Sequence, residues 1–145
     1  MLLTGAFDRR KLQPMTGSDL SRKLQLKAGR QAVVMNAPPG YVSELGVEVR
    51  AGLTGAPDGS VEFLQLFATS LREVNDLVPS VKRALKSDGL LWISYPKGTS
   101  KIKTDLNRDI LRKAMEKAGL AGVSLVSIDD VWSAMRFRPP DKVGR

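Results

Sequence analysis

Short apolar runs alternate with amphipathic segments along most of the chain. Residues 32–37, 61–68 and 90–95 are mostly apolar and short, a pattern typical of strands buried in a sheet. Residues 71–85 and 104–118 carry apolar side chains at three- and four-residue spacing, which predicts amphipathic helices. Strands that alternate with helices indicate a parallel sheet.

The first amphipathic helix has recognisable end signals. Thr69 or Ser70 is expected to cap its start, and Glu73 has the spacing of a capping box with Ser70. Pro79 lies inside this helix and is expected to kink or divide it, because the proline ring clashes with the preceding turn.

The second helix is expected to begin at Thr104, with Asp105 in a first turn where the helix dipole favours negative charge. Gly119 is expected to end it. Asp88 and Gly89 predict a turn just before the strand 90–95.

The segment before the second strand is less regular. A short helical turn is expected to begin at Ser18 and to end at Gly29, and another is expected over residues 41–45. Residues 46–60 hold four glycines and a proline, which predicts a loop with a brief strand at 47–49.

Two apolar segments, 123–128 and 131–137, predict a β pair at the end of the domain. The expected fold class is therefore α/β, with a reduced Rossmann-like, mostly parallel sheet and a C-terminal antiparallel β pair. We expect a single domain over residues 19–138, a loosely ordered basic arm over 1–18 and a tail over 139–145.

The composition excludes several kinds of catalytic site. The 145-residue chain has no Cys and no His, so it holds no thiolate nucleophile, no Ser–His or Cys–His pair and no zinc site built on those ligands. Acid–base chemistry would fall to Asp, Glu, Lys or Tyr. The sequence therefore assigns no catalytic residue, no metal site and no cofactor.

The formal net charge of +8 is unevenly distributed. Residues 1–30 hold seven basic and two acidic side chains, 31–70 hold one and four, and 71–145 hold fifteen and nine. This balance favours an anionic partner such as a phosphate or a nucleic acid, although a solubilising surface is the alternative.

No apolar run reaches the roughly 18 residues of a membrane span, and we expect a cytoplasmic protein without membrane contact.

Residues 61–137 resemble the second half of an S-adenosylmethionine-dependent methyltransferase domain. The segment 85–93, in which Gly89 precedes an apolar strand with an aromatic residue, is similar to the entry of a strand in that fold. The resemblance implies a strand, a helix, a second strand, a second helix and a closing hairpin.

The first half departs from the cofactor-binding pattern of that family. Methyltransferases place a Gly-rich turn after their first strand, whereas residues 36–40 read Asn-Ala-Pro-Pro-Gly, and the two prolines have no amide to donate. An acidic residue for the ribose hydroxyls could only be Asp58 or Glu62. The interval before the second strand is also short for the two βα units usual there.

A second resemblance spans about residues 20–138 and is to small bacterial proteins known only as a domain of unknown function, the DUF3052-like group. This resemblance implies no activity. The segments that carry it are residues 23–24, 27–29, 37–41, 67–70, 91–97, 104–106 and 129–137.

The loop after the third strand is the first candidate site, because ligands of open α/β sheets bind beyond the carboxyl ends of the strands and helix N-termini favour anions. The alternative is a solvated loop, and its residue order does not match a P-loop. The candidate ligand-binding residues here are Lys97, Thr99, Ser100, Lys101 and Lys103.

Other residues have a possible functional role and a simpler structural one. Asn36 and Tyr41 follow the first strand and could line the same crevice, or Tyr41 could pack beneath a rigid proline turn. Asp129 and Asp130 could hold a metal or act as a base, but an Asp pair before a strand is typical of a turn. The basic residues near the N-terminus could contact nucleic acid or form a charged tail: Arg9, Arg10, Lys11, Arg22, Lys23, Lys27 and Arg30.

The hypothesis that follows is a non-catalytic or ligand-binding Rossmann-like domain, with a small anionic ligand in a crevice between residues 36–41 and 95–104. One alternative is a diverged transferase in which Tyr95 or Lys97 handles a proton. Another is an adaptor that binds nucleic acid or protein through its charge. The sequence does not indicate an oligomeric state.

Overall fold

The three apolar runs form neighbouring parallel strands in the computed structural model, which describes residues 18–143. They are β1 (Ala32–Met35), β2 (Val61–Phe67) and β3 (Leu85–Pro96). Two further strands, β4 (Ala121–Ser127) and β5 (Trp132–Arg138), form an antiparallel hairpin, and β5 pairs antiparallel with β3. The sheet order is β1-β2-β3-β5-β4, which confirms the predicted fold class.

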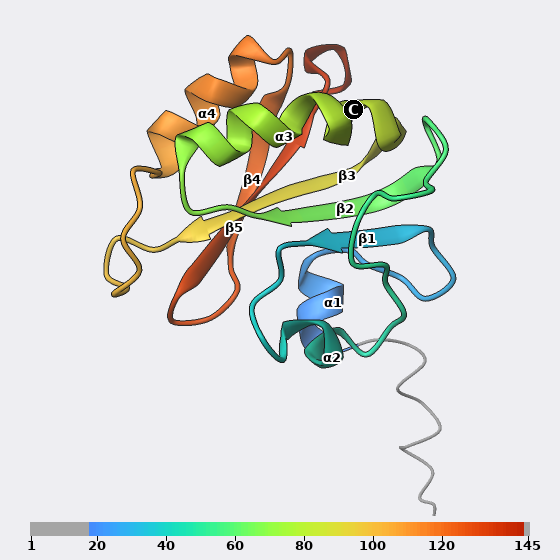
Figure 1. Cartoon of the computed structure of the whole chain (residues 1–145), viewed down its shortest axis with the longest axis horizontal. Coiled ribbons are helices and arrows are strands. Elements are labelled where there is room, and N and C mark those ends of the chain that lie inside the picture. Colours follow the sequence, from blue (N-terminus) through green and yellow to red (C-terminus); the bar gives the residue numbers. More distant parts are fainter. Residues whose placement is uncertain (1–17, 144–145) are drawn as a thin grey trace, which may run out of the picture.

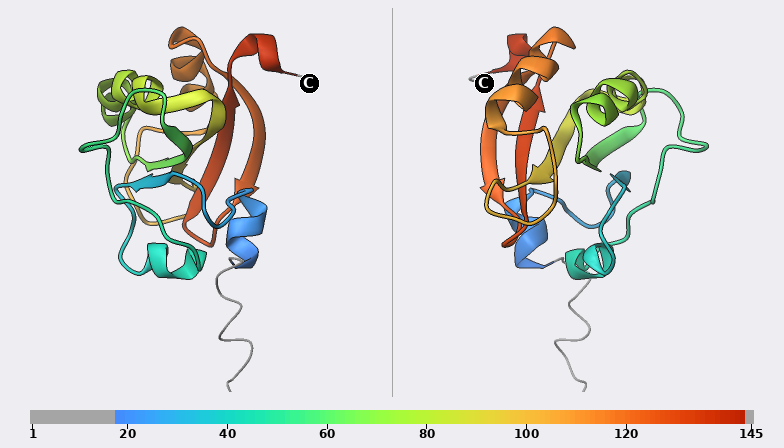
Figure 2. Two further views of the ribbon diagram at one scale, coloured as in Figure 1. Left: turned by 90° about the vertical axis from the view of Figure 1, so that its right-hand side faces the viewer. Right: turned by 60° about the vertical axis from the view of Figure 1, so that its left-hand side comes forward.

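The helices cover both faces of this sheet (Figures 1 and 2). One face carries α3 (Leu71–Ala84) and α4 (Arg108–Lys117), and the other carries the short helices α1 (Asp19–Lys23) and α2 (Tyr41–Leu45). Because successive side chains of a strand point to opposite faces, Leu91 and Ile93 of β3 belong to the core beneath α3 and α4, whereas Trp92 belongs to the core on the α1 and α2 side.

The core on the α1 and α2 side contains a buried hydrogen-bond chain. The Tyr41 hydroxyl donates to Oε1 of Gln65 at 2.8 Å, and Nε2 of Gln65 donates to Oγ of Ser94 at 2.9 Å. Trp92 donates from Nε1 to the Leu24 carbonyl at 2.9 Å and so fixes the end of α1 to the sheet. Buried polar groups need such partners, and this chain supplies them.

The start of α3 confirms the predicted capping residues, with one change in their pairing. Ser70 is the N-cap, and its hydroxyl accepts from the Glu73 amide at 3.1 Å. The Glu73 carboxylate returns to the Thr69 amide at 2.9 Å instead of to Ser70. Pro79 does not divide the helix, which continues to Ala84 because Val78 and Val81 on both sides of it are buried against the sheet.

The start of α4 differs from the prediction. The helix begins at Arg108 with Asn107 as its cap, whereas the cap predicted from the sequence was Thr104, three residues earlier. Thr104 instead accepts a hydrogen bond from the Leu106 amide, and the Asp105 carboxylate accepts from the Leu71 amide at 2.8 Å, so it stabilises the first turn of α3. At the other end, Gly119 terminates α4 as predicted, with a φ of +85°.

Two predictions near the N-terminal half need correction. The first helical turn ends at Lys23 rather than near Gly29, because Gln25 adopts a φ of +63° that buries both neighbouring leucines. Residues 47–49 do not form a strand. Only Arg50 pairs with β1, through an isolated bridge to Val33.

The predicted turn at Asp88 and Gly89 is instead a bulge inside a continuous strand. Val61 pairs with Leu85 while Phe63 pairs with Leu90, so β3 inserts extra residues at its start. A Cβ atom on Gly89 would lie 3.0 Å from the Lys86 carbonyl oxygen, and Asp88 has a φ of +55°. Bulges of this kind redirect side chains, and the consequence for the surface is described below.

The predicted N-terminal arm and C-terminal tail are described only in part. Pro140–Lys142 form a short 3-10 helix, η3, within the predicted tail. The predicted basic arm lies outside the described residues except for Ser18. Across residues 18–143 no helix has the length and apolarity needed to cross a membrane.

Candidate functional site

A pocket of about 490 Å³ lies at the carboxyl end of β3. Its walls come from the loop after β3, the start of α4 and the β4–β5 hairpin, and they include Lys97, Thr99 and Arg108. Lys97 is held to the hairpin because its amide donates to the Val131 carbonyl at 2.7 Å and its ammonium group donates to Oγ of Ser127 at 2.6 Å. We call this the carboxyl-edge pocket.

The electrostatics of the carboxyl-edge pocket favour a small anion. Arg108 is the first residue of α4, where helix amides and the dipole attract negative charge, and within the described residues its guanidinium has no ion pair. Asp109 is also part of the lining, and its carboxylate lies 3.4 Å from the Arg112 guanidinium outside the pocket. Burial raises the pKa of the neighbouring Tyr95, while Arg108 and Arg112 act in the opposite direction.

The rest of the predicted loop is not part of this pocket. Lys101 and Lys103 are exposed and make no ion pair with another described residue. The Ser100 amide donates to the Lys97 carbonyl at 2.9 Å, and the buried Ser100 hydroxyl lacks a hydrogen-bond partner among the described residues. Of the predicted loop residues, Lys97 and Thr99 therefore line the pocket.

Asn36 and Tyr41 do not join the Lys-rich loop in one crevice. Asn36 lines a separate pocket of about 480 Å³ with Thr69, Ser70 and Glu73, because β2 lies between β1 and β3. Its side-chain amide lies 3.4 Å from both the Phe67 carbonyl and the Glu73 carboxylate. Tyr41 lies in the core, as the simpler interpretation expected, and burial raises its pKa.

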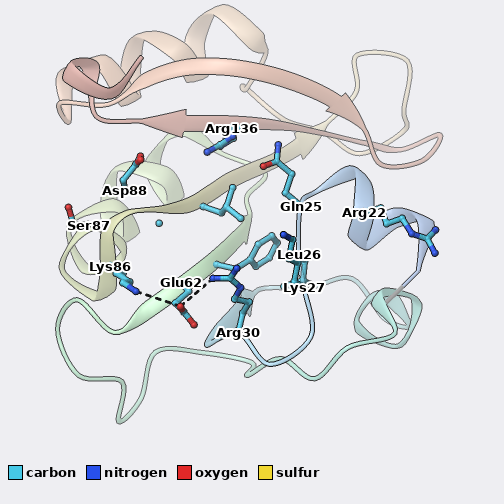
Figure 3. A pocket seen from close by; sticks show the side chains of 13 residues that line it. Arg22, Gln25, Leu26, Lys27, Arg30, Glu62, Lys86, Ser87, Asp88 and Arg136 are labelled. Atoms are coloured by element: carbon cyan, nitrogen blue, oxygen red, sulfur yellow. Dashed lines mark ion pairs between the residues drawn. The ribbon is translucent and has the colours of Figure 1, made fainter. Parts of the chain in front are cut away.

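The opposite edge of the sheet holds a larger cavity of about 690 Å³ (Figure 3). It lies where β2 and β3 begin, and the bulge of β3 forms one wall. We call it the amino-edge pocket. Five cations line it against two carboxylates, Glu62 and Asp88. The cations are Arg22, Lys27, Arg30, Lys86 and Arg136.

Both carboxylates of the amino-edge pocket are already paired. Glu62 lies 3.6 Å from Arg30 and 3.7 Å from Lys86, and it accepts the Gln31 amide at 2.9 Å, a contact that lowers its pKa more than the two cations do. Asp88 accepts two hydrogen bonds from Arg138, at 2.8 and 3.1 Å, and this pair lowers the pKa of Asp88. Arg22 pairs with Asp19, so Lys27 and Arg136 are the lining cations without an ion pair among the described residues, and the pocket retains an excess of positive charge.

Sequence analysis had assigned other possible roles to several of these residues. Arg22, Lys27 and Arg30 were among the residues that could contact nucleic acid or form a charged tail. Nothing in their spacing showed that α1, the β3 bulge and β5 meet at one edge.

Asp129 forms a turn, because its carboxylate accepts hydrogen bonds from the Val131 and Trp132 amides at 2.8 and 2.9 Å. No group of metal-ligating side chains occurs between residues 18 and 143.

The fold defines the class of structure to which the chain is similar: the methyltransferase-like Rossmann folds. It resembles a SAM-dependent methyltransferase from Aquifex aeolicus with a TM-score of 0.61 and 16% identity, over 90% of this chain and 98% of that one. A TehB-like SAM-dependent methyltransferase from Corynebacterium glutamicum matches with a TM-score of 0.58 and 14% identity, over 84% and 88%. These likenesses show the fold.

Sequence comparisons add nothing to this result. No family model matches the chain, so the resemblance to the DUF3052-like group has no support from that comparison. No curated protein matches either.

The residues present do not fit S-adenosylmethionine at the usual position after β1. Pro38 and Pro39 have no amide hydrogen, and the Tyr41 amide already donates to the Pro38 carbonyl at 3.1 Å. β1 is the edge strand, so among the described residues no strand lies on its outer side to carry an acidic residue for a ribose. Glu62 lies at the opposite edge of the sheet, where it is bound by Arg30 and Lys86.

Proposed function

We propose that this protein is a non-catalytic, methyltransferase-like domain that binds a small anion, such as phosphate or a carboxylate, in the carboxyl-edge pocket. The observation that supports it is the convergence of Lys97, Thr99 and Arg108 on the N-terminus of α4. Ligands of this fold class bind at the carboxyl ends of the strands, and helix amides with an adjacent guanidinium form a good anion site.

Each side chain has a distinct role in this proposal. Arg108 supplies a guanidinium that can form two parallel hydrogen bonds with an oxyanion. The hydroxyl of Thr99 makes no hydrogen bond with another described residue, and the Lys97 ammonium group, fixed by Ser127, contributes charge from the hairpin side. The Asn107 side chain caps the helix by accepting the Ile110 amide, and the earlier amides of the first turn would be available to the ligand.

Calorimetric titration of the full chain with inorganic phosphate tests the proposal. We expect the double variant Lys97→Met, Arg108→Met to lose at least about tenfold in affinity. The matched control is Lys101→Met, Lys103→Met, which removes the same charge from exposed side chains of the neighbouring loop. An equal loss in both pairs would show a general charge effect and would contradict a specific site.

The competing proposal is a diverged transferase, which the fold neighbours support only as a fold. It requires S-adenosylmethionine or its demethylated product to bind, with Tyr95 or Lys97 near the reacting group. We expect no heat from either compound at millimolar concentration. A charge-driven nucleic-acid adaptor would instead show binding to RNA or DNA that weakens steeply with added salt.

A further inference from the structure

The amino-edge pocket has the size of a site for an organic ligand. Its volume of about 690 Å³ lies within the range of roughly 300–1,000 Å³ that is usual for small-molecule sites. It would hold on the order of 20 waters at about 30 Å³ each, so an inorganic ion alone would leave most of it filled with solvent. Leu90 and the stems of the basic side chains add apolar surface to the lining.

Arg136 is the residue whose environment most needs a ligand. It projects from β5 into the pocket (Figure 3), and its Nε atom is buried with no hydrogen-bond partner in the described chain. A buried donor without a partner costs free energy, and in native structures such groups are usually satisfied by protein, water or a bound molecule. Burial also lowers the pKa of this guanidinium, although an Arg stays charged.

The surrounding charges favour an anion over a neutral partner. Arg30 and Lys86 share Glu62, and Asp88 is bound by Arg138, so these carboxylates do not reach Arg136 as hydrogen-bond partners. Lys27 has no ion pair within residues 18–143 and lies on the rim of the same cavity. An anionic group between these side chains would pair with the Arg136 guanidinium and reduce the repulsion among the cations.

We propose that the amino-edge pocket binds an organic phosphate of nucleotide size, with its phosphate on Arg136 and its apolar body over Leu90. This site is separate from the carboxyl-edge pocket, and it lies at the edge of the sheet that this fold class does not commonly use for ligands. The bulge at residues 86–89 opens the space for it.

The experiment measures binding of two probes to the full chain, adenosine monophosphate and 1-naphthyl phosphate, with adenosine and 1-naphthol as uncharged counterparts. We expect at least one phosphate ester to bind and both counterparts to bind at least about tenfold more weakly. If the natural ligand is a nucleotide, adenosine monophosphate should bind more tightly than 1-naphthyl phosphate. If it is a simple aryl phosphate, 1-naphthyl phosphate should bind more tightly. Failure of both esters at millimolar concentration overturns the proposal.

Variants locate the site and separate it from the proposed function. Arg136→Met is expected to lower affinity at least about tenfold without lowering the thermal midpoint of the ligand-free protein, because it removes a buried donor that has no partner. The matched control, Arg83→Met on the exposed side of α3, should leave affinity within about twofold. Loss of ester binding in Lys97→Met, Arg108→Met but not in Arg136→Met would place the ligand at the other edge and overturn this inference.

Discussion

The two edges of the parallel strands differ in how they could hold an anion. The carboxyl-edge pocket offers a helix N-terminus and two cations in about 490 Å³, and its carboxylate, Asp109, is paired with Arg112. The amino-edge pocket offers about 690 Å³ and five cations, of which Lys27 and Arg136 have no ion pair within residues 18–143, and its two carboxylates are both engaged. Fold precedent favours the first edge, whereas charge and an unsatisfied buried donor favour the second.

This difference has a structural cause. At the carboxyl edge, loops connect the strands to the helices that follow, and in this fold class the side chains of such loops form the usual ligand sites. At the amino edge, the bulge of β3 over residues 86–89 and Arg136 from the antiparallel hairpin form walls of the pocket. A ligand site argued from fold alone would therefore miss the edge with the greater excess of charge.

The largest effect on stability is expected at the bulge that forms the amino-edge pocket. In Gly89→Ala the new Cβ would lie 3.0–3.1 Å from two backbone carbonyl oxygens, which cannot move independently of the sheet. We expect a loss of about 1–3 kcal/mol in the free energy of unfolding, measured by urea denaturation, together with weaker ester binding.

The control for this variant is Gly122→Ala in β4. There the nearest atom is Sδ of Met135, also at 3.0 Å, but a methionine side chain can shift to make room. We expect a smaller loss of stability and unchanged binding at both edges. Equal losses in the two variants would indicate that the bulge is no more constrained than an ordinary strand position.

Tyr41→Phe tests whether Tyr41 belongs to a ligand site or to the core. The variant leaves Oε1 of Gln65 without its donor in a buried position, which should cost about 1–3 kcal/mol of unfolding free energy. Phosphate affinity at the carboxyl-edge pocket should not change. A stable variant with weakened phosphate binding would restore Tyr41 as a ligand-binding residue.

Asp88→Asn probes the ion pair that closes the amino edge, and its effect should be smaller because both partners are partly exposed. Arg138 lowers the pKa of Asp88 in the folded state, so the carboxylate stabilises the protein above its unfolded pKa and loses this contribution as the pH falls through the lowered folded pKa. The wild type should therefore be more stable than the variant at pH 7. Thermal midpoints should begin to converge as the pH falls below about 4, the unfolded pKa; a constant difference would exclude this linkage.

The smallest effect on stability is expected for Lys97→Met at the carboxyl edge. Its ammonium group bonds Ser127 at the surface, so its removal should change the free energy of unfolding by no more than about 0.5 kcal/mol. Phosphate affinity should nevertheless fall, which distinguishes a binding role from a structural one. Thermal denaturation and calorimetry on the same sample measure the two quantities.

Much of the fold could be predicted from local patterns. The apolar runs at 32–37 and 61–68 form β1 and β2, and the caps at Ser70 and Gly119 act where expected, because these signals depend on neighbours within one helical turn. The errors occurred where distant contacts override local preference. Asp105 binds the start of α3 instead of its own helix, and Gln25 ends α1 so that Leu24 and Leu26 are both buried.

The candidate sites divide in the same way. From the sequence, one could predict a cluster of Lys and hydroxyl groups after the third strand, and Lys97 and Thr99 do line a pocket there. The separation of Asn36 from that loop could not be predicted, because it depends on the order of the strands in the sheet.

The sequence by itself determined the alternation of strands and helices, the absence of Cys and His chemistry and the excess of positive charge. Only the tertiary structure decided where that charge gathers. Lys27 and Arg136 are more than 100 residues apart in the chain, and they line one cavity because α1 packs on the same face from which Arg136 projects. Local patterns encode which face of an element is apolar, whereas the neighbours of a surface charge depend on how the elements pack.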